Sequence, residues 1–301
     1  MPFDSTPGRL SLRGIFYNRR VPELPEVETI ARGVNARVRG DRIAETWFGS
    51  HREPFKTPAA AQAKGLEGRK ILSVHRSGKH IVCELGPLAG KQPTSGRKSV
   101  AQWIVHLGMT GRLLVTTPES PVAPHTHARL RLESERELRF VDPRRFGRLE
   151  FRNLRADPGF TAPGLDPIRV KSRDFAALFR GRRLTIKAAL LKQSLLAGVG
   201  NIYADESLFR AGIRPRRRAE RLTTAELEKL RLALKSVLQD AIRRGGSSVS
   251  DYVDAEGVRG FFQLEHRVYQ RTGEPCVVCG NLIHRVVITG RSTHFCPHCQ
   301  K

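Results

Sequence analysis

The strongest constraint on this chain is a pair of two-cysteine motifs near its carboxyl terminus. In the segment CVVCGNLIHRVVITGRSTHFCPHC, Cys276 and Cys279 form one C-x2-C pair, and Cys296 and Cys299 form a second pair 16 residues further on. Two such knuckles joined by a hairpin offer four thiolates to a tetrahedral Zn²⁺ ion. Because sulfur would fill all four positions, none is left for a catalytic water. We therefore expect one zinc ion with a structural role.

Other ligands and other cysteine chemistry are possible in this segment. His284, His294 and His298 could compete as ligands, although we expect the four sulfurs to bind the metal. Free or disulfide-bonded cysteines are the alternative, which the spacing disfavours. The fifth cysteine, Cys83, stands alone in a strand-like run, so we expect a buried core thiol.

The charge of the chain favours a polyanionic partner. Lys and Arg total 53 and Asp and Glu total 29, so the formal net charge is +24. Such a surplus is typical of proteins that bind nucleic acid, although an anionic membrane surface would also attract it. The sequence has no apolar run of about 18 residues for a membrane span, and its first 20 residues lack the apolar core of a secretory signal. We therefore predict a soluble cytoplasmic protein.

Residues 22–152 are predicted to form an antiparallel β domain with a helix at its start. The helix has apolar residues at helical spacing and ends at Gly40. Its predicted buried stripe is Val27, Ile30, Ala31, Val34 and Val38. Strand-like runs follow at 70–85, 99–117, 127–142 and 145–151. The Gly-, Pro- and Ser-rich stretch 86–99 is expected to be a loop.

The second half of the chain has helical patterns. The proline-rich stretch 153–170 is predicted to be a linker, 171–264 a helical domain, and 265–301 a zinc finger. Within the helical domain, 172–181 suggests one short helix, and 185–212 suggests two helices broken at GVGN. The clearest helix follows Thr223, which forms a capping-box pattern with Glu226. Its predicted buried stripe is Leu227, Leu230, Leu234, Val237, Leu238 and Ala241.

Five motifs in order make the chain resemble bacterial formamidopyrimidine-DNA glycosylases from Pro22 to Lys301. They are PELPEVETI at 22–30, HLGMTGRL at 106–113, DPRRFG at 142–147, GVGNIYADESLFRAGIRP at 198–215, and YQRTGEPCVVCG with FCPHCQK at 269–301. The resemblance implies an α+β fold with two lobes. These are an N-terminal β-sandwich with flanking helices, and a C-terminal helical domain with a helix–two-turn–helix and a four-cysteine zinc finger.

The same resemblance implies a bifunctional DNA glycosylase and AP lyase of base excision repair. Such an enzyme excises oxidised purines, including 8-oxoguanine and formamidopyrimidines, and cleaves the strand by β,δ-elimination. A monomer would bind damaged double-stranded DNA in the cleft between the lobes. One alternative is a non-catalytic zinc-containing protein that binds damaged DNA. Another is a relative of endonuclease VIII for oxidised pyrimidines, although those tend to have glycine where Leu24 stands.

The family's nucleophile is the nitrogen of an N-terminal proline, which the motif assigns to Pro22. A free α-amine has a pKa of about 8, so part of it is neutral and can attack the sugar carbon that bears the damaged base. A proline nitrogen inside a peptide bond cannot, because its lone pair is delocalised. We therefore expect 1–21 to be absent from the mature protein, with Val21 read as an initiator methionine. Proteolytic removal, or an extension that disables the lyase, are the alternatives.

Three further catalytic residues follow from the resemblance. Glu23 matches the acid/base group that protonates the sugar ring oxygen, Lys79 the lysine that assists β-elimination, and Arg291 the zinc-finger arginine that clamps phosphates. On sequence alone, Glu23 would be a carboxylate at a helix N-terminus and Lys79 a solvated lysine. Glu26 and Glu28 are expected to have supporting roles only.

The resemblance also assigns residues that contact DNA. Met109, Arg144 and Phe146 match the three residues that fill the gap left by a flipped nucleotide. On sequence alone, packing in the β core would be the simpler interpretation of Met109 and Phe146.

The remaining assignments concern the DNA backbone and the extruded base. The residues that match backbone contacts are His106, His125, Lys187 and Asn201, with Arg182 where the family has lysine. Residues 247–262 match a loop that folds over the extruded base, with Gly257 and Gly260 permitting its motion.

Overall fold

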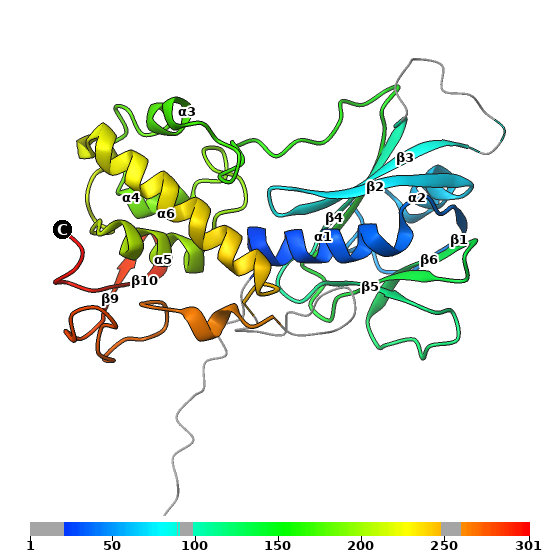
Figure 1. The fold of residues 1–301 in the computed structure, drawn as a ribbon. Coiled ribbons are helices and arrows are strands. Elements are labelled where there is room, and N and C mark those ends of the chain that lie inside the picture. The colour runs from blue at the N-terminus through cyan, green and yellow to red at the C-terminus, as the bar shows by residue number, and fades with distance from the viewer. Residues whose placement is uncertain (1–20, 89, 91–98, 248–259) are drawn as a thin grey trace, which may run out of the picture.

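The computed structural model describes residues 21–88, 90, 99–247 and 260–301, which form two lobes joined by an extended connection (Figure 1). Three predictions fall mainly outside these residues: the fate of 1–20, the loop at 86–99, and the loop at 247–262 with its Gly257. In the described part of the chain, no helix is long and apolar enough to cross a membrane.

The first lobe is a pair of antiparallel four-stranded sheets. One sheet has the order β1 (Ile43–Phe48), β6 (Thr126–Leu132), β7 (Glu137–Val141) and β5 (Arg112–Thr116). The other has the order β2 (Arg69–Ser77), β3 (His80–Leu88), β4 (Ala101–His106) and β8 (Arg148–Asn153). All four strand-like runs of the sequence are confirmed, whereas β1 and α2 (Ala59–Leu66) were not individually predicted.

The core of this lobe is apolar and includes the isolated cysteine. Trp103 and Phe140 are among its largest buried side chains. Cys83 is 1% exposed, as predicted, and burial raises the pKa of its thiol to about 12. This cysteine therefore behaves as a small apolar residue.

Helix α1 (Leu24–Val38) packs against both lobes. Pro25 fits its first turn, where no backbone donor is needed, and the Glu26 carboxylate accepts a hydrogen bond from the N–H of Glu23. The predicted stripe is buried and belongs to the β-lobe core. Leu24, at the start of the helix, belongs instead to the core of the helical lobe. The first turn of α1 is therefore fixed by contacts with both lobes.

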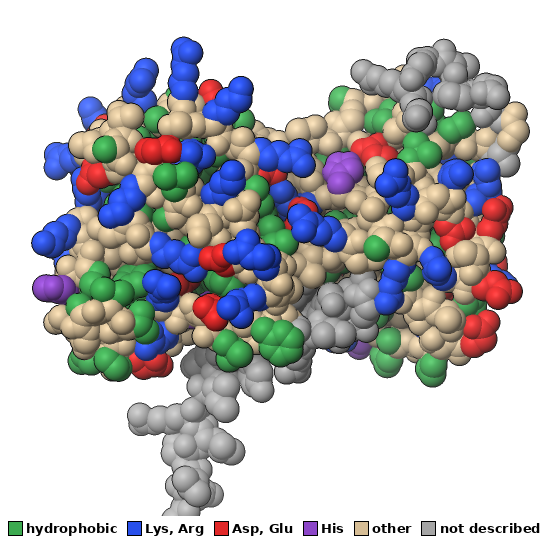
Figure 2. Space-filling view, in the orientation of Figure 1, with side chains coloured by type: hydrophobic (Ala, Val, Ile, Leu, Met, Phe, Trp, Pro, Cys, Tyr) green, Lys and Arg blue, Asp and Glu red, His purple; other side chains and the backbone are tan. Residues whose placement is uncertain are grey.

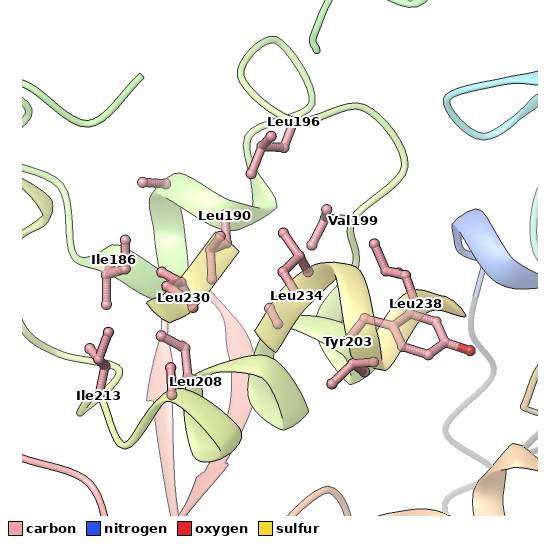
Figure 3. Packing of buried hydrophobic residues seen from close by; sticks show 14 of the residues in the cluster. Ile186, Leu190, Leu196, Val199, Tyr203, Leu208, Ile213, Leu230, Leu234 and Leu238 are labelled. Atoms are coloured by element: carbon pink, nitrogen blue, oxygen red, sulfur yellow. The ribbon is translucent and has the colours of Figure 1, made fainter. Parts of the chain in front are cut away.

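The second lobe consists of helices α3 (Ser172–Ala177), α4 (Ile186–Leu191), α5 (Asn201–Ala211) and α6 (Thr224–Arg243), with short 3₁₀ turns at 219–221 and 262–265. The predicted capping box of α6 is present, since the N–H of Glu226 donates to Thr223 Oγ1 at 3.2 Å. All six residues of its predicted stripe are buried. Figure 3 shows how Leu230, Leu234 and Leu238 face residues of α4 and α5.

Two details of this lobe differ from the simplest helical pattern. Helix α4 ends at Leu191, and a turn-rich segment replaces the expected continuation to GVGN. The final hairpin pairs β9 (His284–Ile288) with β10 (Arg291–Phe295) in antiparallel register and lies against α5. The hairpin therefore reaches the same end of the helical lobe as the start of α5 (Figure 1).

Candidate active site

Three of the four predicted catalytic residues, Glu23, Lys79 and Arg291, line one cavity of about 560 Å³ where the two lobes face each other. Its wall combines the start of α1, the β2–β3 turn, the end of β4, the α4–α5 connection and the tip of the β9–β10 hairpin. Six of the predicted residues line it: Glu23, Lys79, His106, Met109, Asn201 and Arg291. These residues come from both ends of the chain, so only the folded two-lobed structure brings them together.

Glu23 is buried and held at the N-terminus of α5. Its Oε1 atom accepts a hydrogen bond from the N–H of Ile202 at 3.2 Å, in the first turn of that helix. Its Oε2 atom has no hydrogen-bond partner among the described residues. A Cβ atom on Gly200 would collide with this carboxyl group, which explains the glycine in GVGN. The carboxylate is thus fixed by one oxygen, and the other is available for chemistry.

Pro22 and Val21 lie immediately before this carboxylate. Val21 lines the cavity, and the next residue, Pro22, is half-buried. In the 301-residue chain the Pro22 nitrogen is an amide, so it has no nucleophilic lone pair. Cleavage of the Val21–Pro22 bond would remove a residue from the cavity and leave a secondary amine at its edge.

Lys79 occupies the turn between β2 and β3. Gly78 makes this turn with φ of 60°, and a Cβ there would lie 2.9 Å from the Cβ of Ala162. Burial lowers the pKa of the Lys79 ammonium, while Glu23 and Glu26 oppose that shift and Arg291 adds to it. The site therefore places an amine with a depressed pKa beside a carboxylate, a combination suited to proton transfer.

Glu26 forms a buried network that the sequence did not reveal. Its carboxylate accepts hydrogen bonds from the Tyr203 hydroxyl, the Ser247 N–H at 2.7 Å and the Glu23 N–H at 2.9 Å. Burial, and then the charge of Glu23, raise the pKa of Glu26 to about 7. One side chain thus ties α1 to α5 and to the segment after α6.

The β9–β10 hairpin is fastened to α5 by polar contacts. Asn201 Nδ2 donates to the carbonyl of Ser292 at 2.8 Å, next to Arg291. Asp205 Oδ2 accepts the backbone N–H of His294 at 3.0 Å and also contacts its ring. These bonds fix the backbone of the hairpin next to Arg291 against the start of α5.

The position of Lys187 does not suit the predicted direct contact with DNA. Its side chain is 0% exposed, and its ammonium is paired with the equally buried Asp205 and bonded to the carbonyl of Asn201. A side chain without exposed surface cannot touch a phosphate in this conformation. Lys187 instead stabilises the α4–α5 corner that supports the hairpin.

The residues expected to fill a gap in DNA lie on two adjoining loops. Met109 lines the cavity, and Phe146 is 47% exposed, with the guanidinium of Arg144 4.6 Å from its ring centroid. Packing in the β core is therefore the wrong interpretation of Phe146. An exposed aromatic ring stacked with arginine is suited to insertion between bases.

Asp142 organises both loops from beneath. Its Oδ2 accepts the N–H of Gly147 at 2.7 Å, and its Oδ1 accepts the Thr110 hydroxyl and the Arg144 N–H. The backbone N–H of Asp142 donates to the carbonyl of His125 at 3.0 Å. His125 is exposed with φ of 64°, so it lies beside the loop but outside the cavity.

Arg182 also lies outside the cavity. It follows α3, and its Nε donates to the Leu178 carbonyl at 2.6 Å. The structure therefore places it on the helical lobe, away from the residues that surround Glu23.

The four cysteines of the tail form a compact cluster. Their sulfur atoms all lie within 4.8 Å of one another. The backbone N–H groups of Val278 and Cys299 donate to the Cys276 and Cys296 sulfurs, at 3.5 and 3.4 Å. Such donors stabilise thiolates, so the donor set fits one tetrahedral zinc ion. Of the three candidate histidines, none joins the metal-binding groups identified in the described chain.

Basic side chains cover both lobes. Figure 2 shows Lys and Arg on both lobes, most densely on the helical lobe, with acidic side chains among them and a group of acidic side chains at the outer edge of the β lobe. This distribution agrees with the net charge of +24 and suits a polyanion that spans both lobes.

Comparison with known families identifies three consecutive matches. Residues 21–149 match the formamidopyrimidine-DNA glycosylase N-terminal domain, 164–253 match the H2TH domain of the same enzymes, and 273–301 match a zinc finger found in FPG and IleRS. A formamidopyrimidine-DNA glycosylase of Solibacter usitatus is 45% identical over 281 residues. The match covers 93% of this chain and 100% of that protein.

Solved structures agree with this comparison. A Lactococcus lactis FPG mutant bound to DNA containing Fapy-dG matches with a TM-score of 0.80 and 32% identity, over 93% of this chain and 100% of that one. The MutM (FPG) protein of Thermus thermophilus matches with a TM-score of 0.77 and 40% identity, over 93% of this chain and 98% of that one.

Proposed function

Because this chain belongs to the formamidopyrimidine-DNA glycosylase family, and is therefore a DNA glycosylase of base excision repair, we propose that Pro22 is its nucleophile once the Val21–Pro22 bond is absent. The observation that carries this proposal is the position of Val21 inside the cavity, next to the buried Glu23. A proline that begins the chain would present its ring nitrogen where Val21 now lies.

The reaction then follows from groups on both lobes. The neutral Pro22 nitrogen forms a bond to the sugar carbon as the bond to the damaged base breaks, and the base leaves with the electron pair. The new ammonium nitrogen loses its proton to the Glu23 carboxylate, and Glu23, through its free oxygen, passes that proton to the sugar ring oxygen, so that the ring opens to an iminium. The cationic iminium acidifies the neighbouring carbon, and loss of that proton expels the 3′ phosphate. Lys79 assists this proton transfer, and Arg291 binds the departing phosphate.

The DNA would be held open by residues that penetrate it. Met109, Arg144 and Phe146 occupy the space of the flipped nucleotide. Backbone contacts come from His106, His125, Asn201 and Arg182, while Lys187 acts by positioning the corner below the zinc hairpin.

We assign oxidised purines as substrates, including 8-oxoguanine and formamidopyrimidines. Relatives support this class, since the Lactococcus lactis FPG was solved with Fapy-dG in DNA. A structure of the same enzyme with an oxidised pyrimidine makes that class the second candidate. Release of 8-oxoguanine and thymine glycol from otherwise identical duplexes decides between them. We further propose a monomer that acts on chromosomal DNA in the bacterial cytoplasm.

Borohydride trapping tests the nucleophile. The reagent reduces the iminium, so an active enzyme becomes covalently joined to lesion-containing DNA. A chain that begins at Pro22 should form this adduct and nick the strand, whereas the 301-residue chain should bind the same DNA without either product. An adduct formed by the intact longer chain would refute the assignment. Tight binding without adduct by the chain that begins at Pro22 would instead indicate a non-catalytic damage sensor.

A further inference from the structure

A second cavity, of about 180 Å³, adjoins the active site through a shared wall. His106 lines both cavities, which places the second one just outside the catalytic centre. Its other lining residues are Lys56, His80, Ile104, Arg148 and Glu150. None of its charged residues has a part in the chemistry described above.

The lining residues form an ordered row across three strands. His80 of β3 pairs in register with His106 of β4, and His106 pairs with Arg148 of β8. Residues directly opposite each other on neighbouring strands point to the same face of a sheet. Ile104 and Glu150 form the next pair on that face. We call the three paired residues His80, His106 and Arg148 the basic row.

The two imidazole rings are fixed, and their hydrogen-bonding capacity is not used up. Their centroids lie 4.8 Å apart, and Phe160 packs against the other side of His80 at 4.6 Å. His106 Nδ1 accepts the N–H of Gly108 at 3.2 Å, so the proton of the neutral ring is on Nε2, which is a donor. Buried His80 Nδ1 has no hydrogen-bond partner within the described structure.

The charged groups around the row favour an anion. Within the described chain, Arg148 uses only Nη1 for its bonds to the carbonyls of Arg145 and Gly147. Glu150 is the acidic group of the cavity, and it is already paired with Lys56 at 3.1 Å and with Arg152 at 2.7 Å. An incoming phosphate would therefore meet imidazole and guanidinium donors rather than an unpaired carboxylate.

We propose that the basic row and Lys56 form a site for a backbone phosphate of the bound DNA, one position beyond the phosphates held in the catalytic cavity. This inference rests on the proposed function, since it takes DNA as the ligand. The ligand chemistry is a phosphodiester anion on the same strand as the lesion. The row would set how far that strand extends across the β2–β3–β4–β8 sheet.

Binding at this site should be coupled to proton uptake by His80. Burial and the neighbouring His106 and Lys56 lower the pKa of His80 to about 4, with Glu150 and a backbone hydrogen bond with Ser77 opposing them. Burial, Lys79, Arg148 and Lys56 likewise lower the pKa of His106 to about 4. The negative charge of a bound phosphate would offset the repulsion between a protonated imidazole and the neighbouring cations, and would therefore raise these pKa values. His106 cannot take a second proton without losing its bond from Gly108, whereas His80 Nδ1 is free to take one.

Equilibrium binding to an uncleavable duplex tests the site. The probe is a duplex with a tetrahydrofuran abasic analogue, titrated with the full chain between about pH 5.5 and 8 and at several salt concentrations. The test variants are His80→Phe, which keeps the ring stacking, and Arg148→Met, which keeps the aliphatic stem. The matched controls are His75→Phe, since His75 of β2 bonds to Glu84 of β3, and Arg131→Met on β6.

The wild-type affinity should rise as the pH falls, and His80→Phe should weaken binding about tenfold at low pH and flatten this dependence. Arg148→Met should lower the salt slope by about one. The control variants should follow the wild type. Wild-type affinity and pH dependence in His80→Phe, together with an unchanged salt slope in Arg148→Met, would overturn the proposal. Failure of the wild type to prefer the abasic duplex over an undamaged one would instead count against the proposed function, because the row can be assayed on either duplex.

Discussion

Replacing Glu26 by glutamine should change how the stability of the full chain depends on pH. The pKa of this buried carboxyl is raised from 4.5 to about 7 in the folded protein. Each pKa unit is worth about 1.4 kcal/mol, so the difference amounts to about 3 kcal/mol. Because the folded state holds the proton more tightly than the unfolded state, this stability is complete below about pH 4.5 and is lost as the pH rises to 7.

The measurement is urea unfolding of the wild type and Glu26→Gln at intervals from pH 4.5 to 8. A second residue also contributes to the pH dependence of stability, because burial raises the pKa of Glu206 to about 7 as well. The wild type should therefore lose stability from both residues, and the variant from Glu206 alone. The difference in the free energy of unfolding between the two proteins should shift by about 3 kcal/mol across the window, in favour of the variant at high pH.

The variant should nevertheless be less stable at low pH. Glutamine keeps an acceptor oxygen for Tyr203 and Ser247, but its amide group would face the N–H of Glu23, which costs about 1–3 kcal/mol. A Glu206→Gln protein serves as the matched control and should keep the Glu26 contribution. Parallel pH profiles for wild type and Glu26→Gln would refute the reasoning, since they would mean that Glu26 does not hold its proton in the folded state.

Three further outcomes are expected. Asp142→Ala should release the loop that carries Phe146, because it removes the bonds to the N–H groups of Arg144 and Gly147. Binding to an abasic duplex should weaken about tenfold, while the zinc content stays unchanged. An affinity equal to that of the wild type in a binding titration would contradict this role. Removal of zinc by a chelator, or Cys296→Ser, should abolish DNA binding. The near-ultraviolet circular dichroism of the β lobe should persist, because the four cysteines lie around the terminal hairpin. Arg76→Met should cost about 3 kcal/mol in thermal unfolding, because buried Arg76 bridges Glu28 and Asp166, and its loss removes the ion pair with Asp166 and leaves Glu28 with the exposed Arg32; a loss below about 1 kcal/mol would exclude this explanation.

Features set by neighbouring residues could be predicted from the sequence. The capping box at Thr223 and the stripe of α6 need only a few consecutive turns of chain, and the cysteine spacing defines the metal site without further information. The burial of the isolated Cys83 was also predicted correctly, because a single thiol within a strand-like apolar run packs in the core like its apolar neighbours.

Features set by distant contacts could not be predicted. The burial of Lys187 depends on Asp205, and a lysine in a basic chain gives no sign of such a partner. Glu26 contacts Tyr203 and Ser247, which lie 177 and 221 residues away along the chain. Phe146 is apolar and would be expected in the core. Its exposure depends on the loop that Asp142 holds, which the sequence does not reveal.

The helix α1 is shared by both lobes, and this has a consequence for synthesis of the protein. Leu24 belongs to a core cluster whose other members, such as Val199 and Leu238, leave the ribosome long after the PELPEV segment. Its backbone N–H likewise waits for the carbonyl of Gly198. The PELPEV segment is therefore made early but positioned last. A truncated or half-folded nascent chain carries Pro22 and Glu23 without the second lobe that completes the cavity around them.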